Sequence, residues 1–241
     1  AKVHHGAHIA MLARSMTEPS HTALDGTLQA TQRAIESLGG VALPLQVDMR
    51  DAAAYADAIS KALRAFGGLD VLINNASVLW THADAKPRKM DLLWQVNTRG
   101  TLLAIQACTP ALRESRGAVV TLAPPIRLGR LEYISEHPTY TVSKYGMTIA
   151  TLGAASDEIR ANCVWPKRTV KTAATRLLEA TGVMPGAHTR GRPPELVADA
   201  IHRVATGEYN ARALLDEDVL AMPRSRAPLD AFVDPNAFST H

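Results

Sequence analysis

The sequence alternates short, mostly apolar runs with longer stretches whose apolar residues recur at every third or fourth position. The short runs predict β-strands, and the longer stretches predict amphipathic helices. We expect strands at His8–Ala13, Val41–Val47, Leu69–Asn74, Ala118–Leu122, Ala161–Trp165 and Ala211–Leu215. We expect helices at Thr22–Leu38, Asp51–Phe66, Lys89–Arg113, Thr139–Ile159 and Pro194–Thr206. Because strands and helices alternate, the predicted fold class is α/β, with a parallel sheet covered by helices on both faces.

The composition fits one folded α/β domain or two small ones. The chain has 241 residues, of which 46% are hydrophobic and 20% are charged, so it can bury a substantial core. Its formal net charge of +3 comes from scattered basic residues and not from a block of like charge. This distribution indicates neither a nucleic-acid groove nor a membrane-surface helix.

Two cysteines, Cys108 and Cys163, fall in apolar stretches, which predicts buried thiols and not a disulfide framework. His4, His5 and His8 lack carboxylate or cysteine neighbours at ligand spacing, so we expect no metal site. No apolar run reaches the roughly 20 residues that a membrane span needs, and no signal peptide stands at the front of the sequence. We therefore expect a cytoplasmic location.

The most informative motif is Tyr140-Thr-Val-Ser-Lys144, which places a phenol and an ammonium one helical turn apart. Residues four positions apart share a helix face, so the Lys144 charge can lie near the Tyr140 hydroxyl. A nearby cation favours the phenolate and lowers the pKa of a tyrosine from its usual value of about 10. Tyr140 could then act as a general acid or base near neutral pH. The spacing alone also fits a half-buried ring beside a solvated amine.

Further polar residues fall where predicted strands end, which is where open parallel sheets bind their ligands. Asp48 ends one strand, and Asn74-Asn75-Ala76-Ser77 ends the next. Pro166 follows a third strand, and Asn97 lies inside a predicted helix. Each residue has an ordinary explanation as a cap, a turn or a strand terminator. Those explanations do not predict the ordered combination.

This combination resembles the short-chain dehydrogenase/reductase family, from residue 7 to about residue 220. The family's motifs are matched by Asn74-Asn-Ala-Ser77 for NNAG, Asn97 for the structural asparagine, Tyr140 to Lys144 for YxxxK, and Pro166-Lys167 for PG. More narrowly, four segments are similar to the hydroxysteroid dehydrogenase-like branch of the family: Asn-Asn-Ala-Ser, Ala-Pro-Pro at 123–125, Lys-Tyr-Gly-Met at 144–147 and Trp-Pro-Lys at 165–167. The resemblance implies a single-domain, Rossmann-like, doubly wound parallel sheet.

The resemblance also implies roles for individual residues. Tyr140 would pass a proton to or from the substrate oxygen, while the nicotinamide C4 exchanges a hydride with the substrate carbon. Lys144 would lower the Tyr140 pKa and hydrogen-bond the nicotinamide ribose, and Asn97 would hold a water that connects Lys144 to solvent. Further cofactor contacts are implied for Asp48 and Met49 at the adenine, for Asn75, Ala76 and Ser77 along the adenosine and ribose, and for Pro166, Lys167, Thr169 and Val170.

Arg14 follows the first predicted strand, at the position where the family reads the adenosine 2′ group. A basic residue there favours a 2′-phosphate, whereas a carboxylate favours the free hydroxyl. The resemblance therefore favours NADP(H) over NAD(H). A solvated surface arginine is the other interpretation of Arg14.

The family's catalytic serine has no counterpart in this sequence. Its position falls on Ala123 or Pro124, and neither side chain can donate a hydrogen bond. Loss of one donor to a developing oxyanion costs on the order of 10²–10³ in rate. Thr121, Ser135 or Thr139 could supply a replacement hydroxyl. The branch named above carries Pro-Pro at this point, so a proline does not by itself exclude activity.

The family's first strand and its TGxxxGxG loop are also without a counterpart, because no glycine-rich loop precedes Ala10. The backbone of that loop cradles the cofactor pyrophosphate at a helix N-terminus. The missing strand would be the central one in the order 3-2-1-4-5-6, and without it the two flanking strands would have unpaired edges. We expect either that the natural protein has these residues or that the sheet closes differently.

These observations predict an NADP(H)-dependent oxidoreductase that interconverts a carbonyl and an alcohol on a small lipophilic substrate of fatty-acyl, terpenoid or steroid-like type. The alternative is a catalytically silent relative that senses a cofactor or binds a partner. The helices around Asn97 and Tyr140 would form a four-helix interface in a homodimer or homotetramer, as they do in the family. We expect the catalytic domain to cover residues 1–221 and a C-terminal coil or partner arm to cover 222–241.

Overall fold

The strands predicted from the sequence are present, and all of their pairings are parallel. The computed structural model describes residues 6–19, 26–80, 82, 84–127 and 131–222. The strands are β1 His8–Ala13, β2 Val41–Gln46, β3 Val71–Asn74, β4 Ala118–Leu122, β5 Arg160–Trp165 and β6 Arg212–Leu215. The parallel pairings confirm the α/β class.

Helices follow the strands, and several helix ends are explained by single residues. The helices are α1 Leu28–Glu36, α2 Ala52–Phe66, α3 Pro87–Leu93, the π-helical turn η2 Trp94–Arg99, α4 Gly100–Ser115, α5 Leu131–Glu136, α6 Pro138–Leu152, α7 Ala173–Ala180, α8 Pro194–Thr206 and α9 Asp216–Ala221. The side chains of Thr27 and Asp51 accept backbone N–H bonds at the starts of α1 and α2. Gly67 ends α2 with φ +75°, a conformation that favours glycine.

Some of the predicted helix boundaries are wrong. The helix expected over Thr139–Ile159 ends at Leu152, because a turn follows in which the Ser156 hydroxyl accepts the N–H groups of residues 158 and 159. The helix expected over Lys89–Arg113 is instead α3, η2 and α4 in succession. α5, α7 and α9 were not expected, because each is too short to show a helical period in the sequence.

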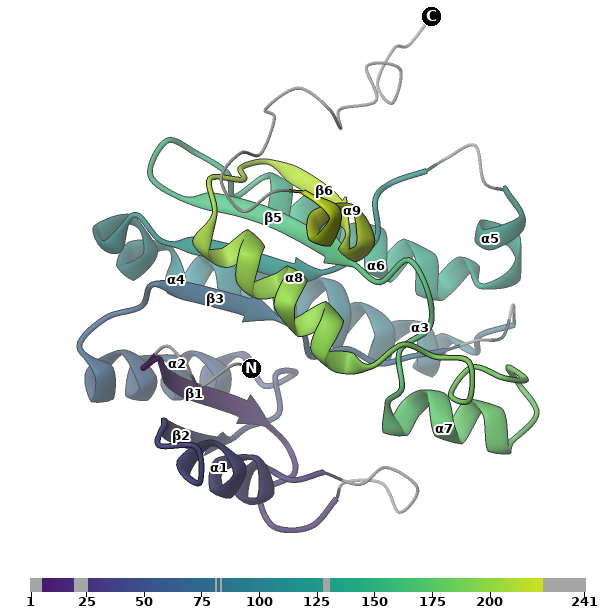
Figure 1. The fold of residues 1–241 in the computed structure, drawn as a ribbon, viewed down its shortest axis with the longest axis horizontal. Coiled ribbons are helices and arrows are strands. Elements are labelled where there is room, and N and C mark those ends of the chain that lie inside the picture. The colour runs from purple at the N-terminus through teal and green to yellow at the C-terminus, as the bar shows by residue number, and fades with distance from the viewer. Residues whose placement is uncertain (1–5, 20–25, 81, 83, 128–130, 223–241) are drawn as a thin grey trace, which may run out of the picture. The chain divides into compact units, whose positions relative to one another are not determined.

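One compact unit comprises residues 1–68 and 168–202. Its two strands pair in register from His8 opposite Val41 to Ala13 opposite Gln46. α1 and α2 pack against this two-stranded sheet (Figure 1). Among the described residues β1 pairs with β2 alone.

The second compact unit comprises residues 69–167 and 203–241. Its sheet has the order β3-β4-β5-β6, and β3 pairs with β4 alone among the described residues. α4 and α6 pack against each other and against this sheet (Figure 1). The largest fully buried apolar side chains of this unit are Leu93, Leu112, Val119, Val120, Met147, Val164, Val204 and Val219. The predicted boundary between a domain at 1–221 and an arm at 222–241 stays a prediction, since residues 223–241 lie outside the described residues.

Candidate active site

α6 places Tyr140 and Lys144 on its buried side. The helix begins at Pro138, whose fixed φ suits the first helical position. Tyr140 is 9% exposed and Lys144 is 2% exposed. The other buried side chains of α6 are Thr141, Ser143, Met147, Thr148 and Thr151. The predicted pair therefore lies in the interior of this unit, which excludes the interpretation of Lys144 as a solvated amine.

The Lys144 ammonium is held at the end of β4. Its Nζ donates to the Leu122 carbonyl at 2.9 Å and lies 5.5 Å from the ring centroid of Trp165. Burial lowers the pKa of Lys144 to about 8, because a low-dielectric environment disfavours the charged form. Burial also raises the pKa of the neighbouring Cys163 thiol to about 12, so this thiol is neutral near physiological pH.

Asn97 joins α6 to the segment that follows β3. Its side chain is fully buried, and its Oδ1 accepts the Val78 N–H at 2.7 Å. Its Nδ2 donates to the Val78 carbonyl at 3.0 Å and to the Ser143 hydroxyl at 2.9 Å. Ser143 in turn donates to the Tyr140 carbonyl at 2.8 Å. Asn97 lies in the π-helical turn η2, and such turns occur often at functional sites.

Thr121 does not lie where the missing serine is needed. Its hydroxyl accepts from Asn74 Nδ2 at 3.1 Å and from the Thr151 hydroxyl at 2.7 Å. Thr151 is eleven residues after Tyr140 on α6, which is about 16 Å along a helix that rises 1.5 Å per residue. Thr121 is therefore removed from the candidate replacement donors.

The other positions near the missing serine do not supply a hydrogen-bond donor to the substrate oxygen either. Ala123 is fully buried and has no donor, and the Pro124 carbonyl accepts the Thr148 hydroxyl at 2.8 Å. Thr139 lines a groove of about 360 Å³ on the outer side of α6, and Ser135 is exposed. None of these contacts assigns a second donor beside Tyr140.

The loop after β5 is fixed by the first two residues of α9. The backbone N–H of Lys167 donates to Asp216 Oδ1 at 2.9 Å, and Asp216 is fully buried. The Lys167 ammonium pairs with Glu217 at 3.3 Å. Because these contacts hold the backbone after Pro166, the predicted cofactor positions Pro166 and Lys167 have a rigid support.

Asn75, Ala76 and Ser77 follow β3 and are exposed. They belong to the same unit as Tyr140, Lys144, Asn97, Pro166 and Lys167. The structure therefore brings eight of the predicted site residues into one unit.

The remaining predicted cofactor residues lie in the other unit, at the ends of β1 and β2 and in the segment before α7. Arg14 follows β1, and Asp48 and Met49 follow β2. Arg50 binds the Asp48 carboxylate through Nε at 3.0 and 2.9 Å and through Nη2 at 2.5 Å. This pairing with Arg50 lowers the pKa of Asp48, and the nearby Arg14 charge lowers it further.

Thr169 and Val170 are held by a short parallel bridge. The Thr169 carbonyl accepts the Arg192 N–H at 2.9 Å, and the Arg192 carbonyl accepts the Lys171 N–H at 2.9 Å. The Val170 carbonyl accepts the Thr175 hydroxyl at 2.7 Å. Both predicted residues therefore have an ordered backbone.

The remaining expectations concern metal sites, membrane-spanning helices and the two cysteines. Among the residues that the structure describes, no group of three His, Cys, Asp or Glu side chains could hold a metal ion. Within the same residues, no helix combines the length and apolar character that crossing a membrane requires. Cys108 and Cys163 are free and buried, as predicted. The cytoplasmic location stays a prediction.

Comparisons with known proteins agree with the motifs and with this geometry. A family model described as enoyl-(acyl carrier protein) reductase matches residues 6–200. The chain belongs to the short-chain dehydrogenase/reductase family. Members of this oxidoreductase family use a nicotinamide dinucleotide, and their fold confirms the predicted Rossmann-like parallel sheet.

Two relatives of this short-chain dehydrogenase/reductase and one further solved structure with the same fold illustrate the likeness. Hydroxysteroid dehydrogenase-like protein 2 of Homo sapiens is 37% identical over 223 residues, covering 89% of this chain and 52% of that protein. A putative dehydrogenase from Xanthomonas campestris is 33% identical, with a TM-score of 0.81 over 91% of this chain and 81% of that one. L-Sorbose reductase from Gluconobacter frateurii, solved with NADPH and L-sorbose, is 21% identical with a TM-score of 0.70, covering 88% and 86% of the two chains. The chain spans about half the length of the curated relatives it matches.

Sequence reasoning missed two residues of this short-chain dehydrogenase/reductase that take part in the site. Ser143 connects Asn97 to the Tyr140 backbone, and its signal was a hydroxyl inside the YxxxK motif. Arg50 pairs with Asp48, and its signal was a second basic residue after a strand end. Trp165 precedes the predicted cofactor residue Pro166, and its ring lies against the Lys144 ammonium.

Proposed function

We propose that this protein is an NADP(H)-dependent oxidoreductase that interconverts a carbonyl and an alcohol on a small lipophilic substrate. The observation that carries the proposal is the buried Tyr140–Lys144 pair on α6, tied through Ser143 to Asn97. Buried lysines with a lowered pKa gather at functional sites, because a scaffold gains nothing from burying a charge.

The chemistry assigns a separate task to each residue of the pair. When bound, the nicotinamide cofactor would supply or accept the hydride. Tyr140 donates a proton to the substrate oxygen during reduction and takes it back during oxidation. As the family resemblance implies, the Lys144 charge would favour the phenolate of Tyr140. A lysine has three N–H donors, and one of those of Lys144 binds Leu122, so the others would bind the ribose hydroxyls of the cofactor.

Asn97 would act mainly by holding α6 and the segment after β3 in fixed positions relative to each other. Its Nδ2 is committed to Val78 and Ser143, and its Oδ1 accepts from Val78. A carbonyl oxygen has two lone pairs, so the second one is where we place the relay water between Lys144 and solvent.

The cofactor preference that we propose is NADP(H) over NAD(H). Two guanidinium groups, Arg14 and Arg50, lie with one carboxylate, Asp48, where β1 and β2 end. Arginine matches the geometry of phosphate oxygens and keeps its charge at all physiological pH values. This group of residues therefore fits a 2′-phosphate better than a free ribose hydroxyl.

The substrate class is proposed from the likeness to hydroxysteroid dehydrogenase-like protein 2 and its branch. Fatty-acyl, terpenoid and steroid-like carbonyls all suit it. The donor missing at Ala123 and Pro124 leaves Tyr140 as the assigned donor to the substrate oxygen. We therefore expect turnover to be slower, by on the order of 10²–10³, than in relatives that have the serine.

The test compares Tyr140→Phe with Tyr145→Phe, a matched loss of one hydroxyl on the same helix. Tyr145 accepts the Arg127 N–H at 3.2 Å and has no role in the proposed chemistry. Cofactor affinity is measured first, by nicotinamide fluorescence with NADPH and NADH. Turnover of a carbonyl panel from the three substrate types is then followed by loss of NADPH absorbance. We expect Tyr140→Phe to abolish turnover while NADPH binding persists, and Tyr145→Phe to keep both.

The lack of a donor at Ala123 and Pro124 also favours a second function, that of a catalytically silent relative. Such a protein would sense a cofactor or bind a partner. NADPH binding without turnover of any panel member by the wild-type protein would support this second function. Turnover that survives Tyr140→Phe would overturn the assignment of Tyr140 as the proton donor.

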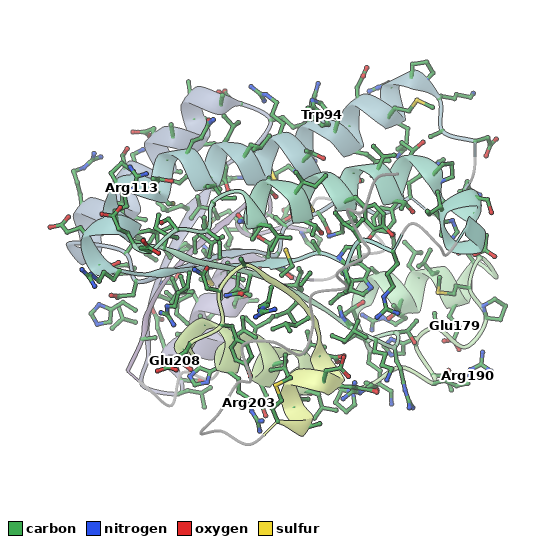
Figure 2. The ribbon with its side chains drawn as sticks, turned by 90° about the horizontal axis from the view of Figure 1, so that it is seen from above. Trp94, Arg113, Glu179, Arg190, Arg203 and Glu208 are labelled. Atoms are coloured by element: carbon green, nitrogen blue, oxygen red, sulfur yellow. The ribbon has the colours of Figure 1, made fainter. Side chains whose placement is uncertain are left out.

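The outer side of the helix layer supports a homo-oligomer, which we propose to be a dimer or tetramer. Its large apolar side chains are exposed, with Trp94 at 52%, Val142 at 67% and Ile149 at 62%. Figure 2 shows Trp94 on the side of this layer that faces away from the sheet. An exposed apolar face of this kind indicates a protein–protein contact. Val142→Glu should yield monomers by light scattering, whereas Val183→Glu, an exposed apolar residue elsewhere, should not.

A further inference from the structure

Trp165 is placed to interact with the charge of Lys144. It is the last residue of β5, and its ring centroid lies 5.5 Å from Lys144 Nζ. A cation within about 6 Å of an aromatic face is attracted by the electron density of the ring, most strongly by tryptophan. The attraction grows when water is excluded, and Lys144 is 2% exposed.

Lys144 has no carboxylate partner among the described side chains. Besides Lys144, α6 carries the titratable groups Tyr140 and Tyr145. The elements that pack against α6 carry the following titratable groups: Arg88, Lys89 and Asp91 on α3, Arg99 on η2, Cys108, Arg113 and Glu114 on α4, Glu132, Tyr133 and Glu136 on α5, Arg160 and Cys163 on β5, and Arg212 on β6. Of the described side chains in this set, only the Cys163 thiol affects the Lys144 charge. That thiol is neutral near physiological pH, and β4 carries no titratable residue.

We propose that Trp165 is a positioning residue for the acid–base pair: its ring face takes the place of a counter-ion and holds the Lys144 ammonium, still charged, at the end of β4. Two contacts then hold the ammonium, one to the Leu122 carbonyl and one to the indole ring. The catalytic meaning of this contact rests on the proposed function. The contact itself can be tested without turnover.

The substitutions must separate the ring from its bulk. Removing Trp165 has two opposing effects on Lys144, because the lost ring destabilises the charge while water entering the space would stabilise it. Trp165→Phe and Trp165→Leu both remove the indole and leave a space of similar size. Only Trp165→Phe keeps an aromatic face. The difference between these two variants therefore measures the ring–cation contact.

The direct measurement follows the Lys144 side chain by NMR in full-length protein labelled with ¹³C-lysine. Lys144→Arg identifies the Lys144 signal by its disappearance. In the wild-type protein we expect titration with a pKa near the value of about 8 that burial sets. Trp165→Phe should titrate close to wild type, and Trp165→Leu should titrate about one pH unit lower. Coincident titration of the two variants would overturn the proposal.

A second measurement uses the native ring, so that the test does not depend on the folding of Trp165→Leu. The sequence has three tryptophans, and Trp80→Phe with Trp94→Phe leaves Trp165 as the sole indole emitter. Its fluorescence should titrate with the same midpoint as the Lys144 NMR signal, and Lys144→Met should abolish that titration. A fluorescence titration that survives Lys144→Met would contradict the contact.

Turnover distinguishes the positioning role from the proposed function. If the NMR pKa differs between the two variants and the wild-type protein has no turnover, the contact stands and the oxidoreductase assignment fails. If the wild-type protein is active, the acidic limb of its kcat/KM profile should move in Trp165→Leu and not in Trp165→Phe. An active enzyme whose two variants share one pH profile and one Lys144 pKa would exclude the positioning role alone.

Discussion

Lys144→Met should make the protein more stable at neutral pH, and this gain should shrink as the pH rises. Methionine has a similar length and no charge, so the substitution removes the cost of burying an ammonium while keeping most of the packing. The Lys144 side chain is 2% exposed. In the described structure its ammonium contacts the Leu122 carbonyl and the face of the Trp165 ring. These contacts offset only part of the lost hydration.

The pKa of Lys144 sets the size and the sign of this effect. Burial lowers the pKa from an ordinary value of 10.5 to about 8 in the folded protein. Below pH 8 the ammonium is charged in both states, and the folded protein carries the full cost, about 3 kcal/mol at 1.36 kcal/mol per pH unit. Between pH 8 and 10.5 the unfolded chain binds more protons than the folded protein, so wild-type stability rises with pH in this window.

Urea unfolding at pH 7 and pH 10, under reducing conditions, measures the free energy of unfolding of both proteins. The advantage of Lys144→Met over wild type should fall by about 2–3 kcal/mol between these two pH values. The buried Cys163 thiol also titrates in the alkaline range, but it is common to both proteins and largely cancels in the difference. Lys61→Met, at an exposed lysine on α2, provides the baseline. A difference that stays constant with pH would refute the reasoning.

Two further substitutions test the packing around the pair by urea unfolding. Asn97→Ala removes the side-chain partner of the Val78 N–H and of the Val78 carbonyl, and it removes the donor to the Ser143 hydroxyl, which keeps its own bond to the Tyr140 carbonyl. This loss should cost about 2–4 kcal/mol, whereas Ser143→Ala should cost about 1 kcal/mol; equal costs would contradict the assigned network. Gly146→Ala would place a Cβ 2.6 Å from Thr98 Cγ2 and should cost about 1–3 kcal/mol. Gly68→Ala, whose Cβ would meet nothing within 4 Å, is its control, and equal stability of the two variants would count against this packing.

The parts of the fold that depend on local sequence were predictable. β4 reads as a short apolar run because it is buried, and Asp51 and Gly67 mark the two ends of α2 through their own side chain or backbone. The π-helical turn was not predictable, because the bonds that surround it come from Val78 and Ser143, which are distant in sequence from Asn97. The short helices were missed because fewer than three turns give no clear period.

In the candidate site, too, features that are local in the sequence were predictable and features that depend on packing were not. The Tyr140–Lys144 spacing is local to one helix, so the sequence alone could identify it. Whether Lys144 is charged, and what holds it, depends on the packing of α6 against β4 and β5, which no local pattern reveals. The same holds for Thr121: its hydroxyl was a reasonable candidate in the sequence, and only its bond to Thr151 shows that it lies about three helical turns from Tyr140.

The cost of the polar core of α6 bears on the choice between an enzyme and a silent relative. Ser143, Lys144, Thr148 and Thr151 are all at most 3% exposed, although apolar side chains of similar volume would be at least as stabilising there. The hydroxyl groups satisfy local backbone carbonyls and so need no further explanation. The buried ammonium does need an explanation, because its burial costs about 3 kcal/mol in a protein whose total stability is on the order of 5–15 kcal/mol. Proton transfer at Tyr140, one turn away on the same face, would give that charge a use, and so would binding of the cofactor ribose. The buried ammonium therefore argues against a scaffold that binds no cofactor, and Tyr140→Phe separates the enzyme from the silent relative.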